Sequence, residues 1–264
     1  MCRLAAAVGP PESTAADLLY VPEHSLSEQA WRPREQQHGH VNVDGTGVAW
    51  WPAGSTTPLS YVTVSTPWAD PNLPSLAASL TGSPILAAVR GATPGVGHGI
   101  SRVAPFVHEQ FAFAHNGWLS NWRTDVGREL VGQVGARGWA VQPGISDSRL
   151  LFGLLLDQLA VGLDLAEAVT RVVGQVAKHV AATGNTATMN ILAANRNAVV
   201  ATRAAVGFTG NSLHVHRAET GLLRVASEPL DAASWQRVPD ASLVHLADGR
   251  IELMPLDVPE LSRD

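Results

Sequence analysis

The chain begins with the stretch MCRLAAAVG (residues 1–9), and two prolines follow it directly. A short apolar run that stops at glycine and proline is typical of a buried strand, so Cys2 to Gly9 is predicted to be one. Cys2 is the only cysteine of the chain. Removal of Met1 would leave it with a free α-amine, which titrates near ~8, close to the ~8.5 of a thiol. This pairing predicts a nucleophile that carries its own base; the alternative is a small apolar residue opening a strand.

Composition is that of a folded protein without an extended charged surface. Of the 264 residues, 45% are hydrophobic and 16% are charged, which is ample for a core and unlike a disordered chain. The net charge of -5 gives no general attraction to nucleic acid or to an anionic membrane. No apolar run approaches the ~20 residues of a membrane span, and the apolar start is too short for a signal peptide. We therefore expect a cytoplasmic protein with neither a nucleic-acid nor a membrane partner.

The order of the strand and helix patterns indicates one layered α+β domain. Two long helical patterns lie in the middle, one beginning at Ser146 and one running from about Asp164 to Val180. A short helix is predicted from Asn72 to Leu80, and Ser25 to Asp44 is predicted to be a polar loop beside a site. No repeat or linker divides the chain, so residues 2–264 are predicted to form a single domain after loss of Met1. The further predicted strands are Gly47–Trp51, Tyr61–Ser65, Pro84–Val89, Phe111–His115, Met189–Ala193, Ala198–Thr202, Leu213–His216, Leu222–Ser227, Ser242–Leu246 and Ile251–Met254.

Three short motifs carry side chains suited to binding an amino acid and a developing oxyanion. Arg90 and Thr93 follow a predicted strand and offer a guanidinium and a hydroxyl to a carboxylate. Asn116 and Gly117 end another predicted strand and offer a side-chain amide and an accessible backbone N–H to an oxyanion. Asp147, in the first turn of a predicted helix, offers a carboxylate to an ammonium group. Each motif also has a purely structural interpretation, respectively a salt bridge, an Asn-Gly turn and a helix cap.

Taken in order, the terminal cysteine and these motifs resemble the class II glutamine amidotransferase family of N-terminal nucleophile hydrolases. The resemblance covers nearly the whole chain and implies a four-layer αββα sandwich with Cys2 at the end of a central strand. It implies neither a cofactor nor a metal. It further implies a γ-glutamyl thioester on the nucleophile and these roles: Cys2 as nucleophile, Arg90 and Thr93 on the substrate α-carboxylate, His115 beside the substrate, Asn116 and Gly117 as oxyanion hole, and Asp147 on the α-ammonium.

The motif around Arg90 departs from the family's glutaminases. Gly91 and Pro94 stand where those enzymes have a bulky aromatic residue and a histidine, which predicts room for a leaving group larger than ammonia. The segments 1–4, 50–52, 115–118 and 146–149 are similar to those of the γ-glutamyl amidohydrolases of ergothioneine biosynthesis. The enzymes of this branch of the family act on γ-glutamyl-hercynylcysteine sulfoxide. Its leaving group carries a trimethylammonium, which aromatic faces bind. The tryptophans predicted to line that pocket are Trp50, Trp51 and Trp118, with core packing as the alternative.

Three rival functions stay open at this point. The pairs His38-Gly39-His40 and His214-Val215-His216 could bind a metal, although no other metal-binding motif accompanies them. The chain could instead be a glutaminase subunit that delivers ammonia to a partner synthase. It could also be a non-catalytic module that holds γ-glutamyl compounds. The favoured hypothesis is a hydrolase with a small-molecule γ-glutamyl substrate, and we expect it to form a homodimer because two-sheet hydrolases of this kind often pair.

Overall fold

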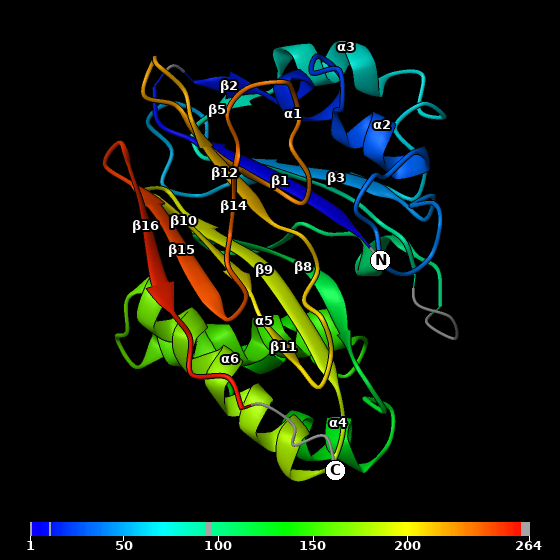
Figure 1. Ribbon diagram of the computed structural model, residues 1–264, viewed down its shortest axis with the longest axis vertical. Helices are drawn as coiled ribbons and strands as arrows, with labels where there is room; N and C mark the ends of the chain where they lie inside the picture. The colour runs from blue at the N-terminus through cyan, green and yellow to red at the C-terminus, as the bar shows by residue number, and fades with distance from the viewer. Residues whose placement is uncertain (1, 11, 93–96, 260–264) are drawn as a thin grey trace.

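Two antiparallel sheets lie face to face between two layers of helices, as the computed structural model shows for residues 2–10, 12–92 and 97–259 (Figure 1). Met1 and Thr93 therefore fall outside the described residues. The first sheet has the order β14 (Gln236–Arg237), β12 (His214–Arg217), β13 (Leu223–Ala226), β1 (Arg3–Val8), β6 (Ile85–Val89), β3 (Thr46–Trp50) and β4 (Leu59–Thr63). The second has the order β16 (Arg250–Pro255), β15 (Ser242–Ala247), β10 (Ala198–Arg203), β9 (Ala187–Asn195), β8 (Phe111–Leu119) and β7 (Phe106–His108).

Short elements complete the two sheets. The strand β11 (Ala205–Val206) pairs with β9, and β2 (Ser13–Thr14) pairs with β5 (Thr81–Gly82) outside the two large sheets. The predicted strands are all present, with ends shifted by a few residues.

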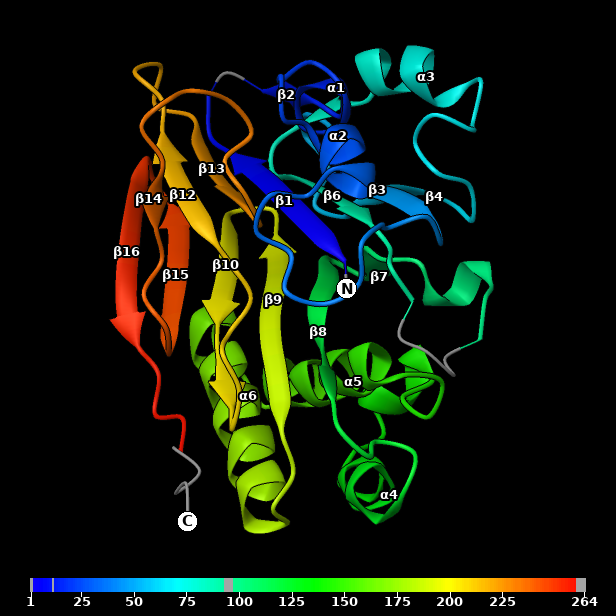
Figure 2. The same cartoon turned by 45° about the vertical axis from the view of Figure 1, so that its right-hand side comes forward.

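Helices cover the outer face of each sheet. The helices α1 (Ala16–Leu19), α2 (Leu26–Trp31) and α3 (Leu73–Ser79) lie on the first sheet, and α5 (Asp147–Ala160) and α6 (Leu165–Ala182) lie on the second (Figures 1 and 2). The helix α4 (Asp125–Gly132) packs beside α5 and α6. This arrangement confirms the αββα sandwich. No helix in the described part of the chain combines the length and the apolar character that crossing a membrane requires.

The sequence of α6 explains why this helix is stable and which face it buries. Its buried residues recur at helical spacing, as in Val169, Val172, Val173 and Val176, and form one stripe against the second sheet. The N-terminus carries a capping box in which Asp164 accepts from the Glu167 backbone and Glu167 accepts from the Asp164 backbone. Burial of each valine contributes ~1.5 kcal/mol or more, so the stripe outweighs the cap energetically.

The first strand lies at the centre of the first sheet, and its alternation decides where Cys2 points. Leu4, Ala6 and Val8 face the core between the two sheets, whereas Ala5 and Ala7 face the outer helices. Cys2 has the same parity as Leu4 and packs against the core between the sheets. The predicted strand is therefore confirmed, although β1 begins at Arg3 rather than at Cys2, and the thiol lies between the sheets at its N-terminal end.

Two local predictions are wrong. Phe111–His115 was expected to end at an Asn-Gly turn, but β8 continues to Leu119, with Asn116 opposite Asn190 and Gly117 opposite Met189. Pairing with β9 on one side extends the strand beyond the point where an Asn-Gly dipeptide alone favours a turn. The stretch Ser25–Asp44 was expected to be a loop, but its first part forms α2, capped by the Ser25 hydroxyl on the Glu28 backbone.

Candidate active site

A narrow cavity beside Cys2 joins the ends of both sheets to the start of α5. Its lining includes five of the side chains or backbones singled out in the sequence, namely Cys2, Arg90, His115, Gly117 and Asp147. The Cys2 Sγ lies 4.0 Å from the carbonyl oxygen of Gly91. Residues from four separate parts of the chain thus meet around one thiol.

Arg90 directly follows β6 and enters the cavity next to the nucleophile strand. Val89 pairs with Arg3 across the sheet, which brings Arg90 level with Cys2. The guanidinium is nearly buried; its Nη2 donates to the Gly97 carbonyl at 3.2 Å, and its Nη1 has no partner among the described residues. A buried N–H of this kind is normally paired, so Arg90 retains a donor suited to a substrate carboxylate.

Asp147 points its carboxylate at the same cavity from the first turn of α5. The N-cap of that helix is Ser146, whose hydroxyl accepts from the Arg149 backbone N–H at 3.2 Å. Asp147 therefore does not serve as the cap. The two Asp147 oxygens accept from the backbone N–H groups of Leu119 at 3.2 Å and Ser148 at 2.8 Å. A carboxylate held in place by these two donors offers a fixed acceptor to an ammonium partner.

His115 lines the cavity, and both of its ring nitrogens have hydrogen-bond partners. Its Nε2 is 3.0 Å from the Thr188 carbonyl, which can only accept, so this nitrogen carries the proton. Its Nδ1 then accepts from the Ser148 hydroxyl at 3.1 Å. Burial lowers the pKa of His115, although the charge of Asp147 and the bond to Thr188 act in the opposite direction. We therefore propose that His115 acts on the substrate by positioning Ser148 and Asp147.

The buried His115 leads to a prediction for stability against pH. Because its folded pKa lies below the unfolded value near ~6.5, the unfolded chain binds the proton first as pH falls. The stabilisation from neutral His115 is complete above ~6.5 and is lost below it, by at most ~1.4 kcal/mol per pH unit. Denaturant unfolding between pH 7.5 and 5 should show a shallower loss in His115→Gln than in wild type. An equal slope in both proteins would contradict the assignment; His214, whose pKa burial also lowers, contributes to both.

Asn116 is fully buried on β8 with an unsatisfied side chain. It shares the parity of Ala112 and Ala114, which face the core between the sheets, so it points to the side on which Cys2 lies. Its backbone carbonyl accepts from the Asn211 amide at 3.0 Å, but neither side-chain polar atom has a partner among the residues that the structure describes. A buried amide without a partner is costly, which favours a role toward a ligand.

Gly117 is required by the close approach of two strands. A Cβ at this position would lie 1.9 Å from the Thr188 carbonyl oxygen and 2.5 Å from His115 Nε2. Any side chain would therefore displace β9 or the His115 ring. The glycine allows β8 to pass the cavity while its backbone stays exposed to it.

The three predicted tryptophans are separated by the fold. Trp50 pairs with Ile85, which pairs with Ala7, so it lies at the end of the first sheet remote from Cys2, roughly 16 Å along the strands. Trp51 follows it and is fully buried in the core between the sheets. The structure does not bring either residue to the cavity, because β3 runs away from the thiol. Both pack in the core, and this part of the prediction is corrected.

Trp118, in contrast, follows Gly117 directly and belongs to an aromatic cluster with His38 and Phe208. The Trp118 ring centroid lies 5.0 Å from that of His38 and 5.2 Å from that of Phe208, and the other two are 4.9 Å apart. The three rings come from three separate segments. Trp118 is not among the residues that line the cavity, and its place in the leaving-group pocket stays a prediction. The sequence did not predict its contacts with His38 and Phe208, because nothing local links residues so distant along the chain.

The cavity also contains residues that the sequence did not single out. Arg102 lines it and donates from Nη1 to the Ile145 carbonyl at 2.6 Å. Ser148 lines it as well and joins His115 to the start of α5. Ser148 directly follows Asp147 in the sequence, whereas Arg102 has no sequence signal of its own. Among the described residues, no group of three or more His, Cys, Asp or Glu side chains is placed to hold a metal ion.

Comparison with known families now adds to this geometry. The family model described as "Glutamine amidotransferases class-II" matches residues 20–219. The chain belongs to this family. The match spans the Arg90, Asn116 and Asp147 motifs, and the αββα fold is that of a class-II glutamine amidotransferase domain.

Individual class-II relatives are similar over almost their whole length. The chain is 33% identical over 257 residues to the γ-glutamyl-hercynylcysteine sulfoxide hydrolase of Mycolicibacterium smegmatis, covering 97% of this chain and 100% of the relative. It is 31% identical over 258 residues to the enzyme of the same name from Mycobacterium tuberculosis, covering 97% of each. A solved glutamine aminotransferase class-II domain protein from Silicibacter pomeroyi has a TM-score of 0.73 at 19% identity, covering 98% of this chain and 100% of that one. This last likeness concerns the fold.

Proposed function

We propose that this protein hydrolyses the γ-glutamyl amide of γ-glutamyl-hercynylcysteine sulfoxide and releases glutamate and hercynylcysteine sulfoxide. The observation that carries the proposal is the full-length similarity to the hydrolases of that name, at 33% and 31% identity. The convergence of Cys2, Arg90 and Asp147 in one cavity supplies the matching chemistry. The protein is accordingly a hydrolase of a small-molecule γ-glutamyl substrate.

Cys2 is the nucleophile in this proposal, once Met1 has been removed. The Cys2 thiol passes its proton to the neighbouring α-amine as the sulfur attacks the γ-carbonyl carbon, and the amine then gives this proton to the departing nitrogen. The carbon–nitrogen bond breaks, leaving a γ-glutamyl thioester on Sγ. Water then attacks the thioester, releasing glutamate and restoring the thiol. The partly buried position of Cys2 at the fixed end of β1 supports this role.

The charges in the cavity match the two ends of a free amino acid group. Arg90 would hold the α-carboxylate through Nη1, which has no partner within the described part of the chain, and Asp147 would hold the α-ammonium. Thr93 stays a proposed carboxylate ligand, since it lies outside the described residues. Asn116 and the backbone N–H of Gly117 would stabilise the oxyanion that forms on attack.

The decisive experiment compares glutamate release from three substrates by purified protein. We expect the highest kcat/KM for γ-glutamyl-hercynylcysteine sulfoxide, a lower value for its demethylated analogue, and the lowest for glutamine. A preference for glutamine would favour the second candidate, a glutaminase subunit with a partner synthase. Gly91 beside Cys2 is the observation that argues against that candidate, because a bulky residue would narrow the leaving side. Location in the cytoplasm and homodimer formation stay predictions.

Trp118 should contribute to the preference for the trimethylated substrate. It lies next to Gly117 and is half-buried, and an aromatic face attracts a quaternary ammonium by ~0.5 to 2 kcal/mol. Replacing Trp118 with leucine should therefore reduce the discrimination between trimethylated and demethylated substrates by roughly 3- to 30-fold. Trp50→Phe is the matched control and should leave the discrimination unchanged, because Trp50 lies remote from the cavity. Equal discrimination in Trp118→Leu and wild type would remove Trp118 from the pocket.

A further inference from the structure

The segment of residues 32–42 links α2 to β3 and passes the N-terminal end of β1 (Figure 2). Most of its side chains are half-buried or exposed, and Asn42 is its buried member. A segment that buries so little apolar surface is held by hydrogen bonds or moves freely. Its polar contacts therefore decide whether it presents a defined surface beside Cys2.

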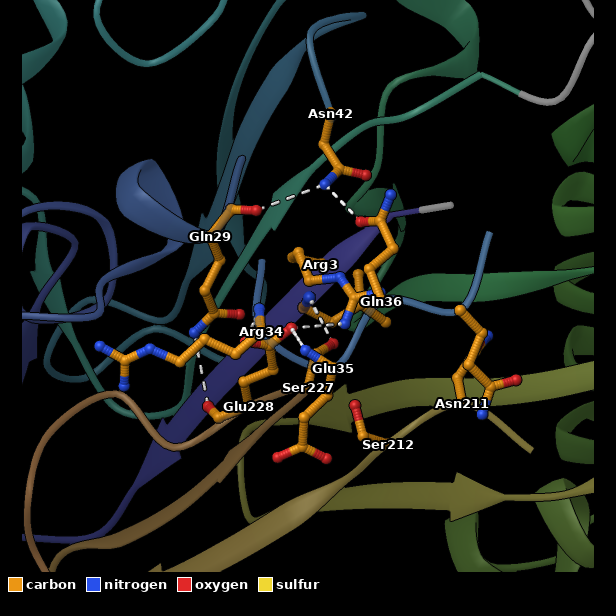
Figure 3. Close-up of polar contacts among 12 residues, drawn as sticks. Arg3, Gln29, Arg34, Glu35, Gln36, Asn42, Asn211, Ser212, Ser227 and Glu228 are labelled. Atoms are coloured by element: carbon orange, nitrogen blue, oxygen red, sulfur yellow. Dashed lines mark hydrogen bonds and ion pairs between the residues drawn. The ribbon is translucent and has the colours of Figure 1, made fainter. Parts of the chain in front are cut away.

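The main anchor of this segment is the fully buried carboxylate of Glu228. Oε1 accepts from the Glu35 backbone N–H at 2.9 Å and from Arg3 Nη1 at 3.2 Å (Figure 3). Oε2 accepts from the Arg34 backbone N–H at 2.8 Å, and His24 Nε2 lies 2.7 Å from it. Burial alone would raise the pKa of Glu228, but the bonds from these donors and the charge of Arg3 hold it below its usual range. One ionised carboxylate thus joins two backbone amides of the segment to β1.

The same anchor is tied to the nucleophile strand. Arg3 directly follows Cys2, and Ser227, which precedes Glu228, accepts at its hydroxyl from the Leu4 backbone N–H at 2.9 Å. The Ser227 backbone N–H donates to the Leu4 carbonyl at 2.8 Å. A shift of Glu228 would therefore change where the segment lies relative to Cys2.

The middle of the segment reaches the aromatic cluster. The His38 ring lies 5.0 Å from that of Trp118 and 4.9 Å from that of Phe208. Gln37 Nε2 donates to the Gly210 carbonyl at 3.1 Å, which fixes the segment to the loop carrying Phe208. The segment is thus held at Glu228 on one side and closes on Trp118, next to the oxyanion site, on the other.

We propose that residues 32–42 form a wall on the leaving-group side of the site, and that Glu228 is the positioning residue that holds this wall in a fixed position relative to Cys2. The inference rests on the proposed function. The wall presents the His38 ring together with Trp118 and Phe208, a surface suited to a large aromatic or cationic leaving group. A leaving group as small as ammonia does not extend to it.

The test compares two reactions of the Glu228→Gln variant, one with a large substrate and one with a small probe. The amide carries two hydrogens of its own and cannot accept from all four donors, so the segment should loosen. We expect KM for γ-glutamyl-hercynylcysteine sulfoxide to rise roughly tenfold. Alkylation of Cys2 by a chloroketone analogue of glutamine, followed by intact mass, should keep its wild-type rate because this probe has no bulky leaving group. Loss of both activities together, or of neither, would overturn the proposal.

Variants at His38 and His40, farther along the segment, avoid the buried ion pair. His38→Ala should raise KM for the conjugate and spare alkylation, whereas the matched control His40→Ala, an exposed residue of the same segment, should change neither. Equal behaviour of the two variants would refute the wall. This comparison decides the question if Glu228→Gln does not fold.

Hydrogen exchange at the Arg34 and Glu35 amides tests the anchor without any substrate. Exchange should be faster in Glu228→Gln than in wild type, and unchanged exchange would contradict the anchor. A wild-type protein that alkylates at Cys2 but releases no glutamate from the conjugate would refute the proposed function alone. The two ideas therefore fail by different outcomes.

Discussion

Replacing Cys2 with alanine should lower glutamate release by on the order of 10⁴-fold or more, because the reaction then lacks its nucleophile. Serine should restore little of this activity, since a hydroxyl ionises far less readily than a thiol near an α-amine. Initial rates with γ-glutamyl-hercynylcysteine sulfoxide measure the effect. Robust release by either variant would exclude Cys2 from the chemistry.

Folding provides the control for the Cys2 variants. Cys2 is partly buried and lies at the edge of the core between the sheets, so its truncation to alanine should cost ~1 kcal/mol or less of unfolding free energy. Thermal unfolding should therefore be nearly unchanged. A second control is the form that keeps Met1, in which a peptide bond blocks the α-amine. Full activity of protein that uniformly retains Met1 would contradict the role of the amine as base.

Asn116→Ala should reduce kcat by on the order of 10² to 10³ with little change in KM, because an oxyanion donor acts in the transition state. Its side-chain atoms have no hydrogen-bond partners among the described residues, so the variant loses no internal bond. Removal of a buried unpaired amide should leave stability equal or slightly higher. A kcat within about threefold of wild type would remove Asn116 from the oxyanion hole.

Asn190 offers a matched control one strand away. It lies opposite Asn116 in the β8–β9 pair and is also buried, but its amide donates to the carbonyls of Asn211 at 3.0 Å and Ser212 at 3.2 Å. Asn190→Ala should therefore lower stability by ~1 to 3 kcal/mol and reduce kcat less than Asn116→Ala does. A large loss of kcat without loss of stability in Asn116→Ala, together with a loss of stability in Asn190→Ala, would assign catalysis to Asn116 and structural support to Asn190.

Much of the fold could be predicted because the relevant signals are local. The apolar run behind Cys2, the stripe of Val169, Val172 and Val176 and the Ser146 cap each depend on neighbours within a few residues. The turn preference of an Asn-Gly dipeptide is also local, and it gave a wrong prediction at Asn116 and Gly117. There, the pairing of β8 with β9 overrides the preference of two residues for a turn.

In the candidate site, too, residues in local motifs could be predicted and tertiary contacts could not. Cys2, Arg90 and Asp147 could be predicted because each occurs in a short motif with the right chemical group. The tryptophans could not be sorted, since Trp50 is near the motifs in sequence but remote in the sheet, whereas Trp118 is beside Gly117. The anchoring role of Glu228 could not be predicted, because its four donors come from segments as far apart as Arg3 and Glu35.

The sequence by itself determined the kinds of chemistry available: a terminal thiol, a cation, an anion and an amide, carried on strands and helices whose periodicity is local. Only the tertiary structure decided which of these groups meet. Strand register places Arg90 level with Cys2 and turns Asn116 toward the space between the sheets, and it leaves Trp50 at the opposite end. The physical reason is that strand register, and the face to which each side chain points, depend on the packing of whole sheets. A change of register moves every side chain of a strand at once, and no single motif encodes it.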